Sequence, residues 1–151
     1  MHSLSELNYD KIDDGIYIGN NMCCTTHFDE RLKGEGITAD MSLEENKVDA
    51  PLGANYYVWI PVVDHAPPAE HQVEFGVAVL EKWVAMGCKV YVHCKNGHGR
   101  APTMVAAYFM KSRGLDALKA EEFVKSKRPS AHLEDAQRQA LKNFEDKLSK
   151  S

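Results

Sequence analysis

Short apolar runs rich in β-branched and aromatic residues alternate along the chain with longer segments in which apolar residues recur every three or four positions. The short runs predict strands and the longer periodic segments predict amphipathic helices. Strands are expected at residues 9–12, 16–19, 37–41, 56–60 and 89–93. Helices are expected at residues 70–86, 100–113, 116–127 and 133–148, with a short additional helix that ends near Gly34. Strands that are followed by helices predict an α/β fold, with a central and mostly parallel sheet flanked by helices on both faces.

Several local signals set the ends of these elements. Asp13-Asp14-Gly15 predicts a tight hairpin between the first two strands, because Asp and Gly accept positive φ angles. Thr25 or Thr26 is expected to cap the short helix that runs through Phe28 and Leu32, and Asp116 to cap the helix that Pro129 stops. The aromatic residues of strand 56–60 are expected in the core or on a sheet face, and Trp83 is expected to be partly buried.

The segment from residue 93 to residue 103 lies between a buried strand and a buried helix and reads His-Cys-Lys-Asn-Gly-His-Gly-Arg-Ala-Pro-Thr. Gly97 and Gly99 allow positive φ angles and close backbone approach, so successive N–H groups can point inward beside a helix N-terminus and bind an anion. Cys94 opens this loop and Arg100 closes it, which brings a nucleophile and a five-donor guanidinium to one tetrahedral anion. A helix N-terminus and a nearby cation favour the thiolate, so we expect Cys94 to be charged at neutral pH.

His93 and the Cys-x5-Arg spacing from Cys94 to Arg100 resemble the signature of the protein tyrosine phosphatase superfamily, and the compact dual-specificity branch fits best. The resemblance covers roughly residues 8–146 of a single domain that spans residues 1–151. Two other groups with this chemistry fit less well. Low-molecular-weight phosphatases carry the loop near the N-terminus, and the domain of the tyrosine-specific phosphatases is much longer than this chain. Rhodanese-like sulfurtransferases have a shorter loop without the preceding His. A glycine-containing turn with an incidental cysteine is the remaining alternative.

The resemblance implies a phosphatase that forms a phosphocysteine intermediate on Cys94, with Arg100 binding the phosphoryl oxygens and no cofactor or metal. It also implies a general acid on the loop after a strand about thirty positions before the nucleophile, where this chain has Asp64. A loop aspartate often only shapes a turn, which is the alternative role of Asp64. His65 is a second candidate for the proton donor, because the ordinary pKa of histidine lies near neutrality.

The other loop residues are expected to bind or select the substrate; they are His93, Lys95, Asn96, Gly97, His98 and Gly99. Phosphotyrosine and phosphoserine or phosphothreonine in proteins are the main expected substrates. Lys95 and His98 partly resemble the loop of lipid phosphatases, and Gly-Arg-Ala-Pro resembles plant glucan phosphatases, so a phosphoinositide or a phosphoglucan is an alternative substrate. A module that binds phosphorylated residues without turnover is the alternative of a different class.

Composition bounds these expectations. Of 151 residues, 44% are hydrophobic and 26% are charged, the net charge is −4, and no apolar run is long enough for a membrane span. Broad nucleic-acid binding and stable membrane insertion are therefore not expected. The N-terminal residues lack the pattern of a signal peptide, which predicts a cytoplasmic protein whose four cysteines are free. No C-x-x-C pair is present, so no metal is expected.

One residue departs from the family loop. Relatives carry a Ser or Thr after the arginine, where this chain has Ala101, and that hydroxyl would donate a hydrogen bond to the cysteine sulfur. Thr103 is the nearest hydroxyl that could replace it.

Overall fold

The structure, a computed structural model, describes residues 6–150. The expectation about a signal peptide falls largely on residues 1–5, which lie outside the described residues. Five strands form one sheet in the order β1-β2-β5-β3-β4. Their bounds are β1 Tyr9–Asp13, β2 Ile16–Gly19, β3 Ile37–Glu44, β4 Tyr56–Val62 and β5 Lys89–His93. The predicted α/β fold is therefore confirmed, and every expected strand is present.

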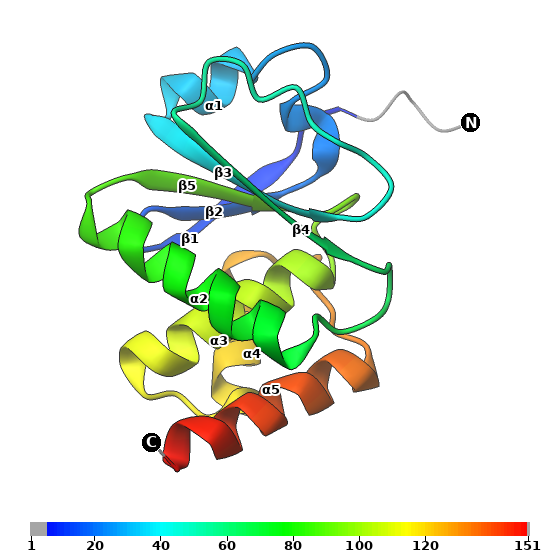
Figure 1. Ribbon diagram of the computed structural model, residues 1–151, viewed down its shortest axis with the longest axis vertical. Helices are drawn as coiled ribbons and strands as arrows, with labels where there is room; N and C mark the ends of the chain where they lie inside the picture. Colours follow the sequence, from blue (N-terminus) through cyan, green and yellow to red (C-terminus); the bar gives the residue numbers. More distant parts are fainter. Residues whose placement is uncertain (1–5, 151) are drawn as a thin grey trace.

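The helices cover both faces of the sheet (Figure 1). One face packs against the four long helices, α2 Glu70–Ala85, α3 Arg100–Arg113, α4 Ala117–Lys127 and α5 Asp135–Ser149. The other face packs against the short elements η1 Asn21–Cys23 and α1 Glu30–Gly34. The larger core lies between the sheet and α3, in which residues 101–110 are all buried.

The central strands run in parallel and bring their carboxyl ends to one edge of the sheet. β5 pairs in parallel with β2 on one side and with β3 on the other, and β3 pairs in parallel with β4. Ser42 is opposite His93, and Glu44 is opposite Val62. The loops that follow β4 and β5 therefore emerge near each other, at the edge where ligands bind in open α/β sheets.

The hairpin and the helix ends mostly agree with the sequence. β1 and β2 are antiparallel around a turn in which Asp14 has φ 55° and Gly15 has φ 80°, as predicted. Asp116 caps α4 by accepting a hydrogen bond from the Lys119 N–H, which is also as predicted. The expected Thr25 or Thr26 cap is wrong, because Asp29 caps α1 by accepting from the Arg31 N–H.

Strand β4 is more exposed than its sequence suggests. It lies at the edge of the sheet, and Tyr56 and Trp59 are each 42% exposed. The Trp59 indole donates to the Glu44 carbonyl oxygen at 2.7 Å, which holds the ring along the edge. Trp83 is more buried than expected, at 5% exposure, because α2 packs against the larger core.

The cysteines differ from the expectation that all are free. The structure joins the adjacent residues Cys23 and Cys24 through a disulfide, whereas Cys88 and Cys94 are free. Within residues 6–150, no helix has the length and apolar character required to cross a bilayer.

Gly114 and Gly34 allow the effect of backbone conformation on stability to be measured without a change in side-chain packing. An added Cβ would meet nothing within 4 Å at Gly114, which ends α3 with φ 66°, or at Gly34 in α1. Gly114→Ala should lower the free energy of unfolding by about 1 to 2 kcal/mol, because only its left-handed conformation penalises a side chain. Gly34→Ala should raise it by about 0.4 to 1 kcal/mol. Unfolding in urea measures the free energy of unfolding of both variants. Equal changes in the two variants would contradict the left-handed conformation of Gly114 as the cause.

Candidate active site

A polar cavity of about 100 Å³ lies at the carboxyl edge of the sheet. Three segments form it: the loop between β5 and α3, the loop between β4 and α2, and the start of α5 with the residues before it. The residues that line it are Asp64, His65, Cys94, Asn96, His98, Gly99, Arg100, His132, Glu134 and Gln137. The structure thus brings together the three residues predicted to carry the chemistry, Cys94, Arg100 and Asp64.

Cys94 and Arg100 lie at opposite ends of the loop that encloses the cavity. Cys94 follows β5 directly, Arg100 is the first residue of α3, and each is 3% exposed. The Arg100 Nη1 donates to the Val62 carbonyl oxygen at 2.8 Å, so the end of β4 holds the guanidinium in place. Its Nε has no hydrogen-bond partner. A guanidinium fixed in this way can offer its remaining N–H groups to an anion in the cavity.

Asp64 lies across the cavity on the loop after β4. Its Oδ1 is 3.3 Å from the Arg100 Nη2 and accepts a hydrogen bond from the His65 N–H at 3.0 Å, while the side chain stays 47% exposed. His65 has φ 67°, a conformation that few residues other than glycine adopt, and its Nδ1 lies 3.2 Å from Glu134 Oε2. Both candidate proton donors therefore line the same cavity, but Asp64 is the one that contacts Arg100.

His93 lies behind the loop and does not line the cavity. Its Nε2 is 2.7 Å from Asp49 Oδ2 and 3.3 Å from Asp40 Oδ1, and all three side chains are fully buried. Burial alone lowers the pKa of His93, but the two carboxylates outweigh it and raise this pKa to about 10. Burial raises the pKa of Asp40 to about 6, against the lowering effect of His93. A buried cation therefore directly precedes Cys94 in the chain.

The remaining predicted loop residues face different directions. Asn96, His98 and Gly99 line the cavity, whereas Lys95 is exposed and is not among the lining residues. Burial lowers the pKa of His98, and the nearby charges of Arg128 and His132 lower it further. Gly97 has φ 75°, and an added Cβ would lie 2.6 Å from the Gly19 carbonyl oxygen, so this turn of the loop requires glycine.

Arg128 holds the loop from behind and was not predicted from the sequence. It is 1% exposed, and its guanidinium donates to the carbonyl oxygens of Gly97 at 2.9 Å and Asn96 at 3.0 Å. The same guanidinium bonds Asp10 and Asn8 at 2.9 and 2.8 Å. Nothing in the local pattern after α4 distinguishes this arginine from a helix-terminal one. Its role depends on contacts with residues far away in the chain.

Gln137 of α5 is a second residue that sequence reasoning missed. It is 1% exposed, lines the cavity, and donates to the Ala66 carbonyl oxygen at 3.1 Å. Its Oε1 accepts from the Glu134 N–H at 2.9 Å. The helix α5 is therefore joined directly to the loop that carries Asp64.

Thr103 does not replace the hydroxyl that is missing at Ala101. Its hydroxyl donates to the Gly99 carbonyl oxygen at 2.7 Å, and this bond uses its one proton. Ala101 is fully buried and belongs, like Cys94, to the larger core.

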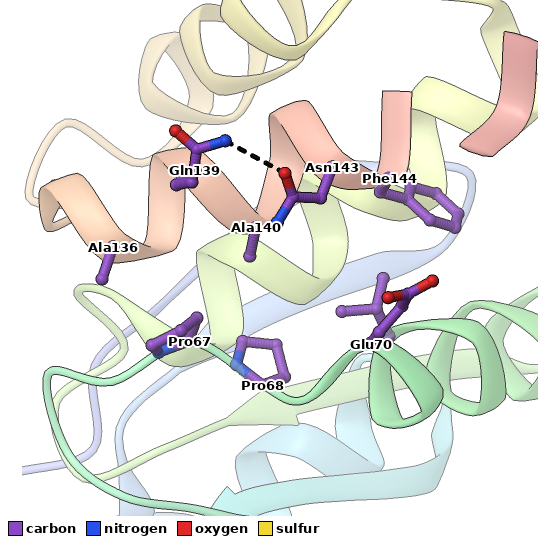
Figure 2. Close-up of a pocket in the computed structure, with 9 residues that line it drawn as sticks. Pro67, Pro68, Glu70, Ala136, Gln139, Ala140, Asn143 and Phe144 are labelled. Atoms are coloured by element: carbon purple, nitrogen blue, oxygen red, sulfur yellow. Dashed lines mark hydrogen bonds between the residues drawn. The ribbon is translucent and has the colours of Figure 1, made fainter. Parts of the chain in front are cut away.

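The loop with Asp64 has a second side that is apolar. Figure 2 shows Pro67 and Pro68 facing α5 across a pocket. The volume of this pocket is about 320 Å³. Val73 and Phe144 add apolar surface, and the Gln139 amide donates to the Asn143 oxygen at 3.0 Å on the helix above. The loop thus separates this pocket from the polar cavity.

A comparison with protein-family models matches residues 16–147 to the family described as dual specificity phosphatase, catalytic domain. The chain belongs to the dual specificity phosphatase family. The predicted membership in the protein tyrosine phosphatase superfamily is confirmed by this match and by the similarity of solved structures.

Curated dual specificity phosphatases and their relatives agree with this family. Human dual specificity phosphatase 28 is 31% identical over 80% of the chain and 69% of its own length. The phosphatidylglycerophosphate phosphatase PTPMT2 of Arabidopsis thaliana is 31% identical over 76% of the chain and 53% of its length. Mouse laforin is 27% identical over 95% of the chain. The chain spans about half the length of the last two proteins, 53% and 51%.

Two solved structures show the same phosphatase fold. Human DUSP28 superposes with a TM-score of 0.84 and 25% identity, over 93% of this chain and 98% of that one. PTPMT1 in complex with PI(5)P superposes with a TM-score of 0.79 and 25% identity, over 94% of this chain and 97% of that one. Human DUSP28 and PTPMT1 thus share the fold described above.

Arg128 provides a test of how this dual specificity phosphatase shapes its loop. Arg128→Lys keeps the charge but loses the guanidinium geometry, which leaves buried carbonyl oxygens of the loop without donors. We expect the free energy of unfolding to fall by about 2 to 4 kcal/mol and aryl phosphate turnover to fall roughly a hundredfold.

The matched control is Arg138→Lys, at an exposed ion pair with Glu121 and Asp135. This change should leave turnover unaltered and shift the unfolding free energy by less than about 1 kcal/mol. Similar turnover in the Arg128 and Arg138 variants would contradict the role of Arg128.

Proposed function

We propose that this chain hydrolyses phosphate monoesters through a phosphocysteine intermediate on Cys94, as one phosphatase domain over residues 1–151 with a core of roughly 8–146. The observation that carries the proposal is the position of Cys94, Arg100 and Asp64 around one polar cavity. The family match and the N-terminus of α3 at Arg100 support it. An anion in this cavity would meet a nucleophile, a fixed guanidinium and a proton donor.

The proposed reaction has two steps. In the first, the Cys94 sulfur attacks phosphorus, an S–P bond forms and the P–O bond to the leaving alcohol breaks, while Asp64 gives that oxygen its proton. In the second, Asp64 takes a proton from water, the water oxygen attacks phosphorus, and the S–P bond breaks to release phosphate. Arg100 and the loop N–H groups bind the three oxygens that carry the charge of both transition states.

The contact between Arg100 and Asp64 has a place in this cycle. Without substrate, the guanidinium at 3.3 Å attracts the Asp64 carboxylate toward the cavity. A bound phosphate dianion would compete for the same guanidinium and repel the carboxylate. Substrate binding would thus release Asp64 from Arg100 and leave its carboxyl group beside the leaving oxygen.

We infer that phosphorylated proteins are the main substrates, at tyrosine and at serine or threonine, because curated dual specificity phosphatases match most of the chain. A phospholipid monoester is the second candidate. PTPMT2 is named a phosphatidylglycerophosphate phosphatase, and PTPMT1 was solved with PI(5)P, at similar identity. His98 at the mouth could contact either class. Parallel assays on phosphopeptides, phosphoinositides, phosphatidylglycerophosphate and phosphoglucans would rank them.

The nucleophile provides the direct test of the proposal. Purified protein should hydrolyse an aryl phosphate in the presence of a chelator, and Cys94→Ser should abolish this while tungstate binding, measured by calorimetry, persists. Cys88→Ser is the control, since Cys88 is the other free cysteine and lies outside the cavity. Parental turnover in Cys94→Ser would refute the proposal. Tungstate binding without any turnover in the parent would support a binding module instead.

Asp64→Asn should slow hydrolysis most for substrates whose leaving groups have a high pKa, because those need the proton. Rates across a series of aryl and alkyl phosphates measure this dependence. His65→Asn is the matched control, because asparagine tolerates the left-handed backbone at φ 67°. If His65→Asn alters the dependence of the rate on the leaving group and Asp64→Asn does not, His65 is the proton donor.

Ala101→Ser should restore the hydroxyl that family members have beside the cysteine sulfur. A hydrogen bond to a charged group is worth about 1.5 to 3 kcal/mol, so hydrolysis of the phosphocysteine should become roughly ten- to a hundredfold faster. Stopped-flow traces of the parent should show a burst with good leaving groups, which the variant removes. No burst in the parent, together with an unchanged kcat in the variant, would contradict this prediction.

A further inference from the structure

Five potential metal ligands lie together behind residues 94–99, the loop between β5 and α3 that is here called the phosphate loop. They are Cys23, Cys24, Asp40, Asp49 and His93, and all five are buried. One ligand atom from each lies within 4.8 Å of every other. The cluster is separate from the polar cavity, because none of these five residues lines it.

The carboxylates of the cluster have more hydrogen-bonding capacity than their surroundings satisfy. His93 Nε2 pairs with Asp49 Oδ2 at 2.7 Å, and Cys24 Sγ lies 3.2 Å from Asp40 Oδ2. Asp49 Oδ1 is buried and has no hydrogen-bond partner. Asp40 Oδ1 is also buried without a hydrogen bond, although His93 Nε2 lies 3.3 Å from it. Most buried polar atoms in proteins are hydrogen-bonded, and these two carboxylate oxygens are not. A further positive charge would stabilise this group.

We propose that Cys23, Cys24 and His93, with one carboxylate from Asp40 or Asp49, bind one Zn²⁺ when the two cysteines are reduced. Zn²⁺ takes four such ligands in a tetrahedron, with Zn–S near 2.3 Å and Zn–N or Zn–O near 2.1 Å. Ligand atoms around one such ion are separated by roughly 3 to 4 Å. The distance of 3.2 Å from Cys24 Sγ to Asp40 Oδ2 and that of 3.3 Å from His93 Nε2 to Asp40 Oδ1 fall in this range.

The redox state of the cysteine pair decides whether the ion can bind. The structure joins the two sulfur atoms, and a disulfide offers no thiolate. A thiol or phosphine reductant supplies two electrons, which break the S–S bond and give two thiols. Each thiol releases its proton when the metal binds, and His93 binds in its neutral form. The oxidised pair and the metal therefore exclude each other.

The mixture of donors selects the kind of metal. Mg²⁺ and Ca²⁺ prefer oxygen ligands alone, whereas two thiolates with an imidazole and a carboxylate favour Zn²⁺ and its substitute Co²⁺. No metal was expected from the spacing of the cysteines, because the ligands of this site come from four separate segments. They are the end of η1 with the next residue, the middle of β3, the loop before β4, and the last residue of β5.

A metal at this place would connect those four segments beneath the phosphate loop. The Asn21 N–H already donates to the Lys95 carbonyl oxygen at 3.1 Å, so η1 contacts the loop directly. Zn²⁺ binding should therefore stabilise the folded protein, and the melting temperature should rise with metal concentration. This consequence does not depend on turnover at Cys94.

Cobalt binding tests the proposal in the Cys94→Ser variant, reduced with a phosphine under nitrogen so that the nucleophile cannot bind the metal. We expect one equivalent of Co²⁺ to give thiolate-to-cobalt charge-transfer bands and the strong visible bands of a tetrahedral site, and one equivalent of Zn²⁺ to displace it. Adding Cys23→Ser and Cys24→Ser should weaken binding by more than about a hundredfold, since loss of outer-shell groups alone costs 10- to 100-fold.

The matched control adds Cys88→Ser instead, which should leave the bands unchanged because Cys88 lies outside the cluster. Asp40→Asn and Asp49→Asn are milder changes that keep the cysteines, and one of them should weaken Co²⁺ binding. Circular dichroism checks that each variant folds. The proposal would be overturned if the reduced Cys94→Ser variant showed no thiolate-to-cobalt bands. It would also be overturned if these bands stayed unchanged after Cys23→Ser and Cys24→Ser are added. Because Cys94 is replaced throughout, the result is independent of the phosphatase reaction.

Discussion

The shape of the phosphate loop depends on the hydrogen bonds that the buried guanidinium of Arg128 donates to it. The carbonyl oxygens of Asn96 and Gly97 face Arg128, and carbonyl oxygens that are withdrawn from water need hydrogen-bond donors. Arg128 provides them for Asn96 and Gly97 and is itself held by Asp10 and Asn8. One side chain thus connects the loop to the first strand and to the segment after α4.

The parallel strands determine what else reaches the cavity. β4 and β5 both end at the same edge, so the carbonyl oxygen of Val62 can hold Arg100 while the next loop brings Asp64 opposite Cys94. Gln137 completes this arrangement by joining α5 to Ala66. The cavity is therefore assembled by strand order and helix packing, and the loop between β5 and α3 supplies only part of it.

Local patterns predicted the strands and the long helices, because each depends on its near neighbours. The family spacing singled out Cys94, Arg100 and Asp64, which line one cavity, and their catalytic roles stay predictions. The predicted cap of α1 was wrong, because Thr25, Thr26 and Asp29 are all residue types that can cap a helix. Asp29 is the one that does so in the structure. Arg128, Asp40, Asp49 and Gln137 could not be predicted. Each is an ordinary polar residue in its own segment, and its importance comes from partners that the fold brings from elsewhere in the chain.

The two edges of the sheet have a consequence for how the protein behaves at high concentration. β1 has an irregular register between Lys11 and Asp13, and β4 contains Pro61, which has no N–H to donate. A strand from another molecule would find an interrupted row of hydrogen-bonding groups at either edge. The exposed aromatic residues of β4 therefore lie on a strand that is poorly suited to edge-to-edge aggregation.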